Sequence, residues 1–247
     1  MTPQLRAVVE DAYTVFAGYT IRHSLTVCHC KVCMDEETER ELLNTPLREI
    51  PAQLLSEYTN SAHDWNDGPA SREMRHFLPR YLELIAMNNA PCSMGIDICL
   101  RRLGQAGWRA KWPKREEEII DRFFDELMIA SVERLEVVRW PVGWRLSFDI
   151  VDVLTLVVTA SGDLDRVLAA WDRARDPAAA IHMAAARERI LTEKSRTYLY
   201  SAYLEDKKEA ADKIGGFLMR REATARIENA FFKVDDRRLQ QILSDAA

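Results

Sequence analysis

Residues Ser147–Thr159 have the sequence SFDIVDVLTLVVT, and they form the segment whose secondary structure is most ambiguous. Their content of Val, Ile and Thr is typical of a β-strand. The apolar side chains nevertheless recur at i, i+3, i+4, i+7 and i+8, at Ile150, Val153, Leu154, Val157 and Val158. Asp149 and Asp152 lie off that face. The helical spacing fits better than strand alternation, so this segment is predicted to be a helix.

The same helical periodicity recurs on both sides of this segment. Helices are predicted at Val8–Phe16, Asp35–Leu43, Pro51–Tyr58, Ser71–Met87 and Ile96–Leu103, from Pro113 onward, and from Pro177 to about Tyr203. The expected N-caps of three of these helices are Asp35, Ser71 and Asp176. Breaks are expected at Trp140–Gly143 and at Gly215-Gly216. No convincing β-hairpin is apparent. The expected fold class is all-α, either a multi-helix bundle or an irregular α-solenoid of about ten helices.

The composition predicts a globular chain. Of its 247 residues, 47% are hydrophobic and 30% are charged, which argues against wholesale disorder. No Gly/Ser-rich or Pro-rich linker divides the chain, so residues 1–247 are expected to form a single helical domain. The weakest seam lies near residues 104–112. It would separate a cysteine-containing part, residues 1–104, from a helical remainder, residues 113–247.

The charge and the hydropathy pattern limit the classes of partner. A net charge of −5 provides no long-range attraction to phosphate backbones, which makes a nucleic-acid partner unfavourable. No apolar stretch approaches the roughly 18–20 residues that cross a bilayer, so no membrane partner is expected. Glu10 and Asp11 interrupt the apolar N-terminal run before a signal peptide could form. We therefore expect a cytoplasmic protein whose cysteines stay reduced.

Three of the five cysteines gather in the run Cys28-His29-Cys30-Lys31-Val32-Cys33. Zn²⁺ prefers thiolate sulfur and imidazole nitrogen, and a C-x-x-C turn such as that of Cys30 and Cys33 presents two thiolates to one ion. Cys28 or His29 could supply a third ligand. The candidates for the fourth are His63, His76, Cys92 and Cys99. Reduced loop thiols and a redox role remain alternatives, although the motif does not follow a strand of a βαβ unit, as redox C-x-x-C motifs do.

Four short motifs lie between residues 28 and 86: Cys30-x-x-Cys33, Thr45-Pro46-Leu47-Arg48-Glu49, Tyr58-x-x-Ser61-Ala62 and Arg75-His76-Phe77-Leu78-Pro79-Arg80. As a set they resemble the motifs of a family of uncharacterised bacterial helical proteins. The resemblance covers about a quarter of the chain and implies no activity, substrate or cofactor. It draws attention to Cys30, Cys33 and His76, which lie on matching positions.

His76 stands apart from the apolar face of its own predicted helix. That face consists of Met74, Phe77, Leu78, Tyr81, Leu82 and Ile85. His76 projects nearly opposite, among Arg72, Arg80 and Glu83. A solvated side chain, a metal ligand, or an anion site shared with Arg72 and Arg80 are the alternatives. We predict a zinc site of Cys28, Cys30, Cys33 and His76, with Arg72 and Arg80 as candidate anion-binding residues.

The remaining patterns decide little about function. No phosphate-binding loop, dinucleotide fingerprint, nucleophile elbow, kinase motif or H-E-x-x-H motif occurs, although an enzyme without them is conceivable. Tryptophans interleave with basic residues at Trp108, Trp112, Trp140 and Trp144, a pattern found in single-strand binders. We expect a non-enzymatic adaptor or immunity-type protein that binds a protein partner. The alternatives are a metal-dependent enzyme with an open zinc site and a zinc-stabilised nucleic-acid binder.

Overall fold

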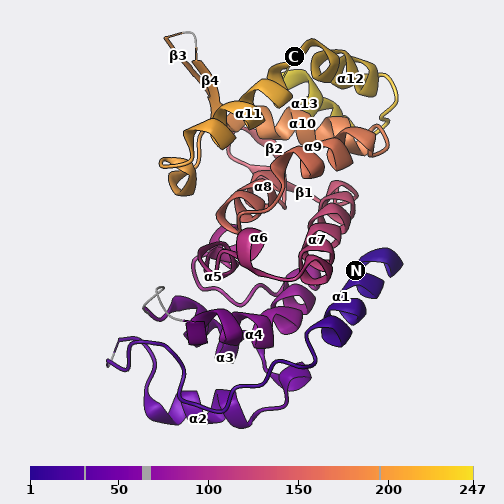
Figure 1. Cartoon of the computed structure of the whole chain (residues 1–247). Helices are drawn as coiled ribbons and strands as arrows, with labels where there is room; N and C mark the ends of the chain where they lie inside the picture. The colour runs from indigo at the N-terminus through magenta and orange to yellow at the C-terminus, as the bar shows by residue number, and fades with distance from the viewer. Residues whose placement is uncertain (31, 63–67, 195, 247) are drawn as a thin grey trace. The chain divides into compact units, whose positions relative to one another are not determined.

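A computed structural model describes the whole chain except residues 31, 63–67, 195 and 247 (Figure 1). It is predominantly helical, with 63% of the residues in helices, which confirms the predicted fold class. The contacts divide the chain into two compact units. Unit 1 comprises Met1–Glu126 and Thr159–Gly162, and unit 2 comprises Leu127–Val158 and Asp163–Ala247. Residues 104–112, where a seam was predicted, lie inside unit 1.

Unit 1 is built from helices joined by irregular segments. They are α1 (Pro3–Val15), α2 (Glu36–Asn44), η1 (Leu47–Glu49), α3 (Ala52–Asn60), α4 (Gly68–Ala86), η2 (Ile96–Ile98), α5 (Arg101–Gln105), α6 (Trp108–Lys111) and the first part of α7 (Lys114–Val132). Their starts follow local chemistry. Asp35 caps α2 by accepting a hydrogen bond from the backbone N–H of Thr38, as predicted. Ser71, predicted as a cap, instead lies inside α4 and accepts a hydrogen bond from the Trp112 indole.

Unit 2 combines helices with two small antiparallel hairpins. Its further elements are β1 (Val137–Trp140), β2 (Gly143–Leu146), α8 (Ile150–Thr159), α9 (Leu164–Arg173), α10 (Ala178–Ala186), η3 (Arg187–Arg189), β3 (Ile190–Glu193), β4 (Arg196–Leu199), η4 (Ala202–Leu204), α11 (Lys208–Met219), α12 (Arg221–Phe231) and α13 (Arg237–Asp245). The helix predicted for Ile150–Val158 is confirmed as α8. Most of its residues are buried, including several off the predicted face, which explains its strand-like composition.

The two hairpins correct the expectation that no hairpin is present. In the first, Val137 pairs with Leu146 and Trp140 pairs with Gly143, so the predicted break at this point is a two-residue turn. In the second, Ile190 pairs with Leu199. The predicted helix from Pro177 to Tyr203 therefore ends at Ala186. The β-branched and aromatic residues that follow favour a paired strand over a continued helix.

Two further expectations in unit 2 were wrong. Asp176 does not cap α10: Pro177 occupies the N-cap, and the Asp176 carboxylate accepts hydrogen bonds from Arg226, at 2.8 Å from Nη2. Gly215 and Gly216 do not interrupt a helix, because α11 runs through both. A Cβ on Gly215 would lie 2.7 Å from the carbonyl oxygen of Thr197, so this glycine allows α11 to approach the backbone of β4 closely.

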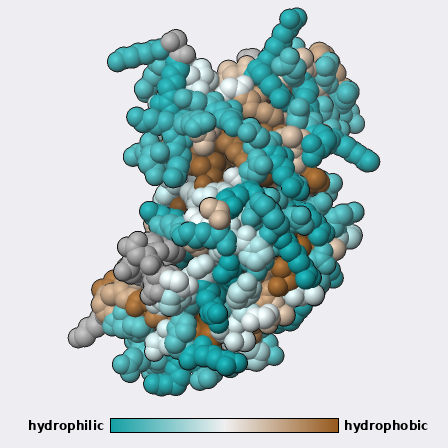
Figure 2. Space-filling view, viewed as in Figure 1, coloured by the Kyte–Doolittle hydropathy of each residue, from teal (hydrophilic) through white to brown (hydrophobic). Residues whose placement is uncertain are grey.

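Each unit encloses apolar side chains and presents a polar exterior. Hydrophilic residues cover most of the face drawn in Figure 2, and hydrophobic residues show there in smaller areas. Phe77 and Trp108 are fully buried in unit 1, and Trp171 is fully buried in unit 2. Among the described residues, no helix is both long enough and apolar enough to cross a membrane.

Candidate metal centre

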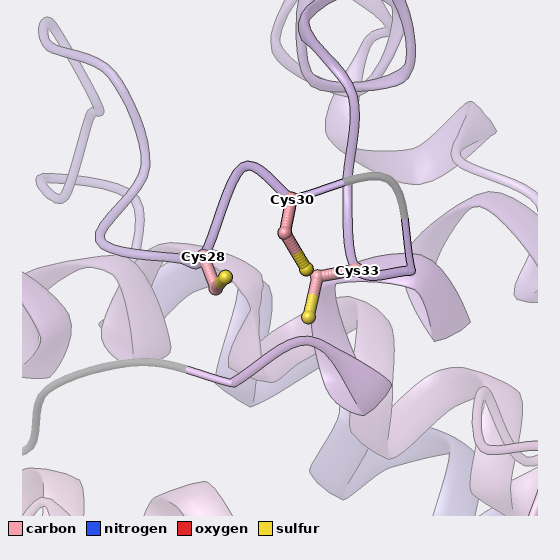
Figure 3. Close-up of side chains that lie close together, drawn as sticks. All are labelled: Cys28, Cys30 and Cys33. Atoms are coloured by element: carbon pink, nitrogen blue, oxygen red, sulfur yellow. The ribbon is translucent and has the colours of Figure 1, made fainter.

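The three clustered cysteines lie in an irregular loop between α1 and α2, and their sulfur atoms converge (Figure 3). The Sγ atoms of Cys28, Cys30 and Cys33 all lie within 4.8 Å of one another. A backbone hydrogen bond of 3.1 Å from the Cys33 N–H to the Cys30 carbonyl closes the C-x-x-C turn. Cys30 is exposed, and Cys28 and Cys33 are half-buried. Three soft ligands thus share one small region that solvent can reach.

The surroundings of the cysteines favour a thiolate at Cys30. The backbone N–H of Val32 donates to its sulfur, and the neighbouring thiols contribute further, which lowers the pKa of Cys30 to about 7. At Cys28 the N–H of Cys30 lowers the pKa, but the thiols of Cys30 and Cys33 outweigh it, so the net shift is upward. The cluster therefore includes one thiol that readily ionises near neutral pH, and the thiolate is the form that binds a metal.

Glu39 of α2 holds one part of the cysteine loop. Its Oε1 accepts a short hydrogen bond from the backbone N–H of Leu25, and its Oε2 lies 2.8 Å from Nε2 of His29. The Glu39 side chain is mostly buried, and it faces inward because it shares the buried side of α2 with Leu42. The loop therefore supplies the polar partners that this carboxylate needs.

Glu73 of α4 holds the adjacent part of the loop, and it is fully buried. Its Oε1 accepts hydrogen bonds from the backbone N–H and the hydroxyl of Thr26, at 2.8 and 2.7 Å. Its Oε2 accepts a hydrogen bond of 3.1 Å from the Tyr58 hydroxyl. The Nδ1 of His23 lies 3.9 Å from Oε1. Glu73 thus joins the loop to α3 and α4 through three hydrogen bonds.

The end of α3 supports the loop from another direction. The backbone N–H of Cys28 donates to the carbonyl of Ala62 at 2.6 Å. Nη2 of Arg102, which is buried, donates to the carbonyl of Ser61, and its guanidinium stacks over the ring of Tyr58 at 4.0 Å. The segment after α3 therefore accepts hydrogen bonds from both Cys28 and Arg102.

The structure does not place His76 with the cysteines: among the described residues, the cluster consists of Cys28, Cys30 and Cys33. The Nδ1 of His76 instead lies 2.8 Å from the carbonyl oxygen of Tyr19, so it donates a hydrogen bond there. Its ring packs edge-on against Phe77. Burial lowers the pKa of His76, against the opposing effect of the Tyr19 carbonyl. Its part of α4 thus packs against the chain after α1.

The predicted anion-binding pair is likewise not assembled. Arg80 donates from Nε to the carbonyl of Ile50 at 2.7 Å and from Nη1 to Glu83 at 2.6 Å. Glu83 also accepts a hydrogen bond from the Tyr13 hydroxyl. Arg72 is exposed near the start of α4. The Arg80 guanidinium is therefore committed to intramolecular acceptors, which argues against an anion shared with Arg72.

The other candidate ligands do not complete the cluster either. His29 is adjacent in sequence, but its Nε2 faces Glu39. Cys99 is buried, which raises the pKa of its thiol, and neither Cys99 nor Cys92 belongs to the cluster. His63 lies outside the described residues. The described part of the chain thus brings together three of the four predicted ligands.

Two residues that matter to the loop, Glu39 and Glu73, were missed as loop contacts in the sequence. A signal was present for Glu73, because it lies four residues before Phe77 and so falls on the apolar side of its helix. A carboxylate in such a position needs buried hydrogen-bond donors. Which donors it finds depends on the tertiary fold, since Thr26 lies 47 residues away in the sequence.

The interleaved tryptophans do not form one exposed surface. Trp108 and Trp112 are buried in unit 1. In unit 2, Trp140 is 47% exposed on the β1–β2 hairpin, and Arg145 stacks over its ring. The aromatic and basic pattern is therefore largely a consequence of packing.

Comparison with known proteins yields no relative. No protein-family model, no curated protein and no solved structure matches this chain.

Proposed function

We propose that this chain binds one zinc ion through Cys28, Cys30 and Cys33 and acts as a helical protein-interaction protein. The convergence of the three sulfur atoms within 4.8 Å carries the proposal. Thiolate sulfur is a preferred ligand of Zn²⁺, and a C-x-x-C turn can present two thiolates to one ion. The ion would cross-link the loop between α1 and α2.

The interaction role is supported by what the loop presents to solvent. Val32, inside the C-x-x-C turn, is 91% exposed. An ion bound to the flanking Cys30 and Cys33 would restrict this turn and reduce the entropy that the turn loses when a partner binds. The metal would thus serve to present an apolar contact residue in a defined conformation.

Metal content tests the zinc site. We expect about one zinc per chain in protein purified without chelators, and loss of that zinc in Cys30→Ser, because one of three thiolates is removed. Cys92→Ser is the matched control, since Cys92 lies outside the cluster, and it should retain its zinc. Metal-free wild-type protein in which Cys28, Cys30 and Cys33 all react freely with a thiol reagent would contradict the proposal.

A second candidate, an enzyme with an open zinc site, is favoured by one observation. The described residues bring three ligands together, and Cys30 is exposed. Catalytic zinc sites characteristically combine three protein ligands with one water. X-ray absorption spectroscopy of the zinc protein separates the candidates: three sulfurs with one water oxygen favour the enzyme, whereas a fourth protein ligand favours the structural site.

A further inference from the structure

Four hydrogen-bond donors close to the cysteines donate to two buried carboxylates. The N–H of Leu25 and the imidazole of His29 meet Glu39, and the N–H and hydroxyl of Thr26 meet Glu73. Glu39 comes from α2 and Glu73 from α4, so the loop is fastened to two helices. We propose that Glu39 and Glu73 are positioning residues that hold the cysteine loop in its metal-binding conformation. This inference rests on the proposed zinc site.

Burial of the carboxylates and conformation of the loop depend on each other. A carboxylate in the protein interior is unfavourable unless hydrogen bonds satisfy it. Glu73 is fully buried, and two of its three hydrogen bonds come from Thr26. If the loop left this conformation, Glu73 would keep only Tyr58 among these donors. The folded helices therefore favour the loop conformation before any ion binds.

The pairing of His29 with Glu39 also orients the cysteines. His29 is directed toward α2, where its Nε2 lies 2.8 Å from Glu39. The sulfur atoms of Cys28 and Cys30, its two neighbours in the sequence, converge instead with that of Cys33. Carboxylates that fix the groups around a metal site typically change metal affinity by about 10–100-fold when they are mutated.

Cobalt(II) provides the test, because thiolate-bound cobalt absorbs in the visible and near-ultraviolet range and substitutes for zinc. The apo form of the full chain is titrated with cobalt(II) alone. We expect Glu39→Gln and Glu73→Gln each to weaken binding by about 10–100-fold. The matched control is Glu37→Gln, an exposed residue of α2, which should bind as the wild type does. Both carboxylates hold the same loop. The fold-loss of cobalt affinity in the double variant should therefore be smaller than the product of the fold-losses in the two single variants.

A conservative pair of variants separates positioning from general loss of stability. Thr26→Val removes the hydroxyl donor to Glu73 but keeps the backbone N–H, and it should weaken cobalt binding. Thr26→Ser keeps the hydroxyl donor, so this variant should bind cobalt with the affinity of the wild type. The thiolate-to-cobalt absorption bands should also change in Glu39→Gln, which a stability effect alone would not cause.

The outcomes distinguish this inference from the proposed function. If the wild type binds cobalt and both glutamate-to-glutamine variants bind it with unchanged affinity and spectrum, the positioning role is overturned and the zinc site stands. If Thr26→Ser behaves like Thr26→Val, the hydroxyl contact to Glu73 is not part of the positioning, which also counts against it. If the wild type itself does not bind cobalt or zinc, both proposals are overturned.

Discussion

The two units bury polar side chains in different ways. Unit 1 buries ionisable side chains with partners: Glu73 accepts three hydrogen bonds, and Glu116 accepts hydrogen bonds from Tyr19 and Arg75. Unit 2 buries His182 completely in α10, an alanine-rich helix that is buried on nearly all sides. In the part of the chain that the structure describes, neither ring nitrogen of His182 makes a hydrogen bond of normal geometry, although the backbone of Arg134 and of Val132 lies close enough to act on its pKa.

This difference separates two ways of tolerating a buried polar group. Glu73 is tolerated because hydrogen bonds replace those it would make with water. His182 is tolerated because it can stay neutral: burial lowers its pKa to about 4. A buried carboxylate with several donors links distant segments of the chain, whereas a histidine that stays neutral needs no such set of partners. In unit 1, a buried carboxylate with hydrogen-bond partners lies beside the cysteine loop, where a defined conformation of the loop matters.

The largest effect is expected from removing the carboxylate that has partners. Glu73→Ala leaves the hydroxyl and N–H of Thr26 and the hydroxyl of Tyr58 without their acceptor. The free energy of unfolding should fall by about 3–5 kcal/mol, since each unsatisfied buried group costs about 1–3 kcal/mol and water can restore some of the bonds. Denaturant unfolding of the apo protein measures it. Glu37→Ala, on the exposed side of α2, should change stability by no more than about 0.5 kcal/mol. Equal losses in the two variants would show that the hydrogen bonds of Glu73 do not stabilise unit 1.

The buried histidine should make unit 2 sensitive to acid. His182 has an ordinary pKa of 6.5 and a pKa of about 4 in the folded chain. Between these values the unfolded chain binds the proton and the folded chain does not, so stability falls as the pH drops from about 6.5 to about 4. The loss from this group reaches roughly 3 kcal/mol near pH 4, at about 1.4 kcal/mol for each unit of pKa difference.

His182→Met tests this assignment because methionine fills a similar volume and does not titrate. Compared with the wild type, the variant should keep its stability near pH 7 and lose less of it at pH 4–5. Hydrogen exchange of peptides from α10 follows unit 2 separately from unit 1. The same loss of protection with falling pH in both proteins would show that His182 is not responsible.

The smallest changes in stability are expected from substituting two neighbouring glycines of unit 2. In Gly215→Ala the new Cβ would meet backbone atoms of Thr197 and Tyr198 at 2.7 Å, and stability should fall by about 1–3 kcal/mol. Nothing lies within 4 Å of a Cβ at Gly216. Gly216→Ala should therefore stabilise α11 by about 0.5–1 kcal/mol. Thermal unfolding distinguishes the two signs. A stabilising Gly215→Ala would mean that α11 does not approach β4 as closely as described.

The predictions made from sequence succeeded where neighbouring residues decide the structure. The helix at Ile150–Val158 and the capping of α2 by Asp35 follow from spacings and contacts of a few residues. The convergence of Cys28, Cys30 and Cys33 is likewise local, because the three lie within one short loop. The hairpin of β3 and β4 was missed because its strands have four residues each, too few for alternation to outweigh the helical pattern before them.

The tertiary structure decided which distant groups meet. No local pattern reports that Glu73 of α4 accepts hydrogen bonds from Thr26, 47 residues earlier, or that His76 faces the Tyr19 carbonyl rather than the cysteines. A helical wheel shows on which side of a helix a residue lies, but not what packs against that side. Local spacing was thus sufficient for helices such as α2 and α8 and for the three thiols, since these depend on backbone geometry over a few residues. The groups that hold the thiols in place depend on how α2, α3 and α4 pack, because buried polar groups must find their partners within that packing.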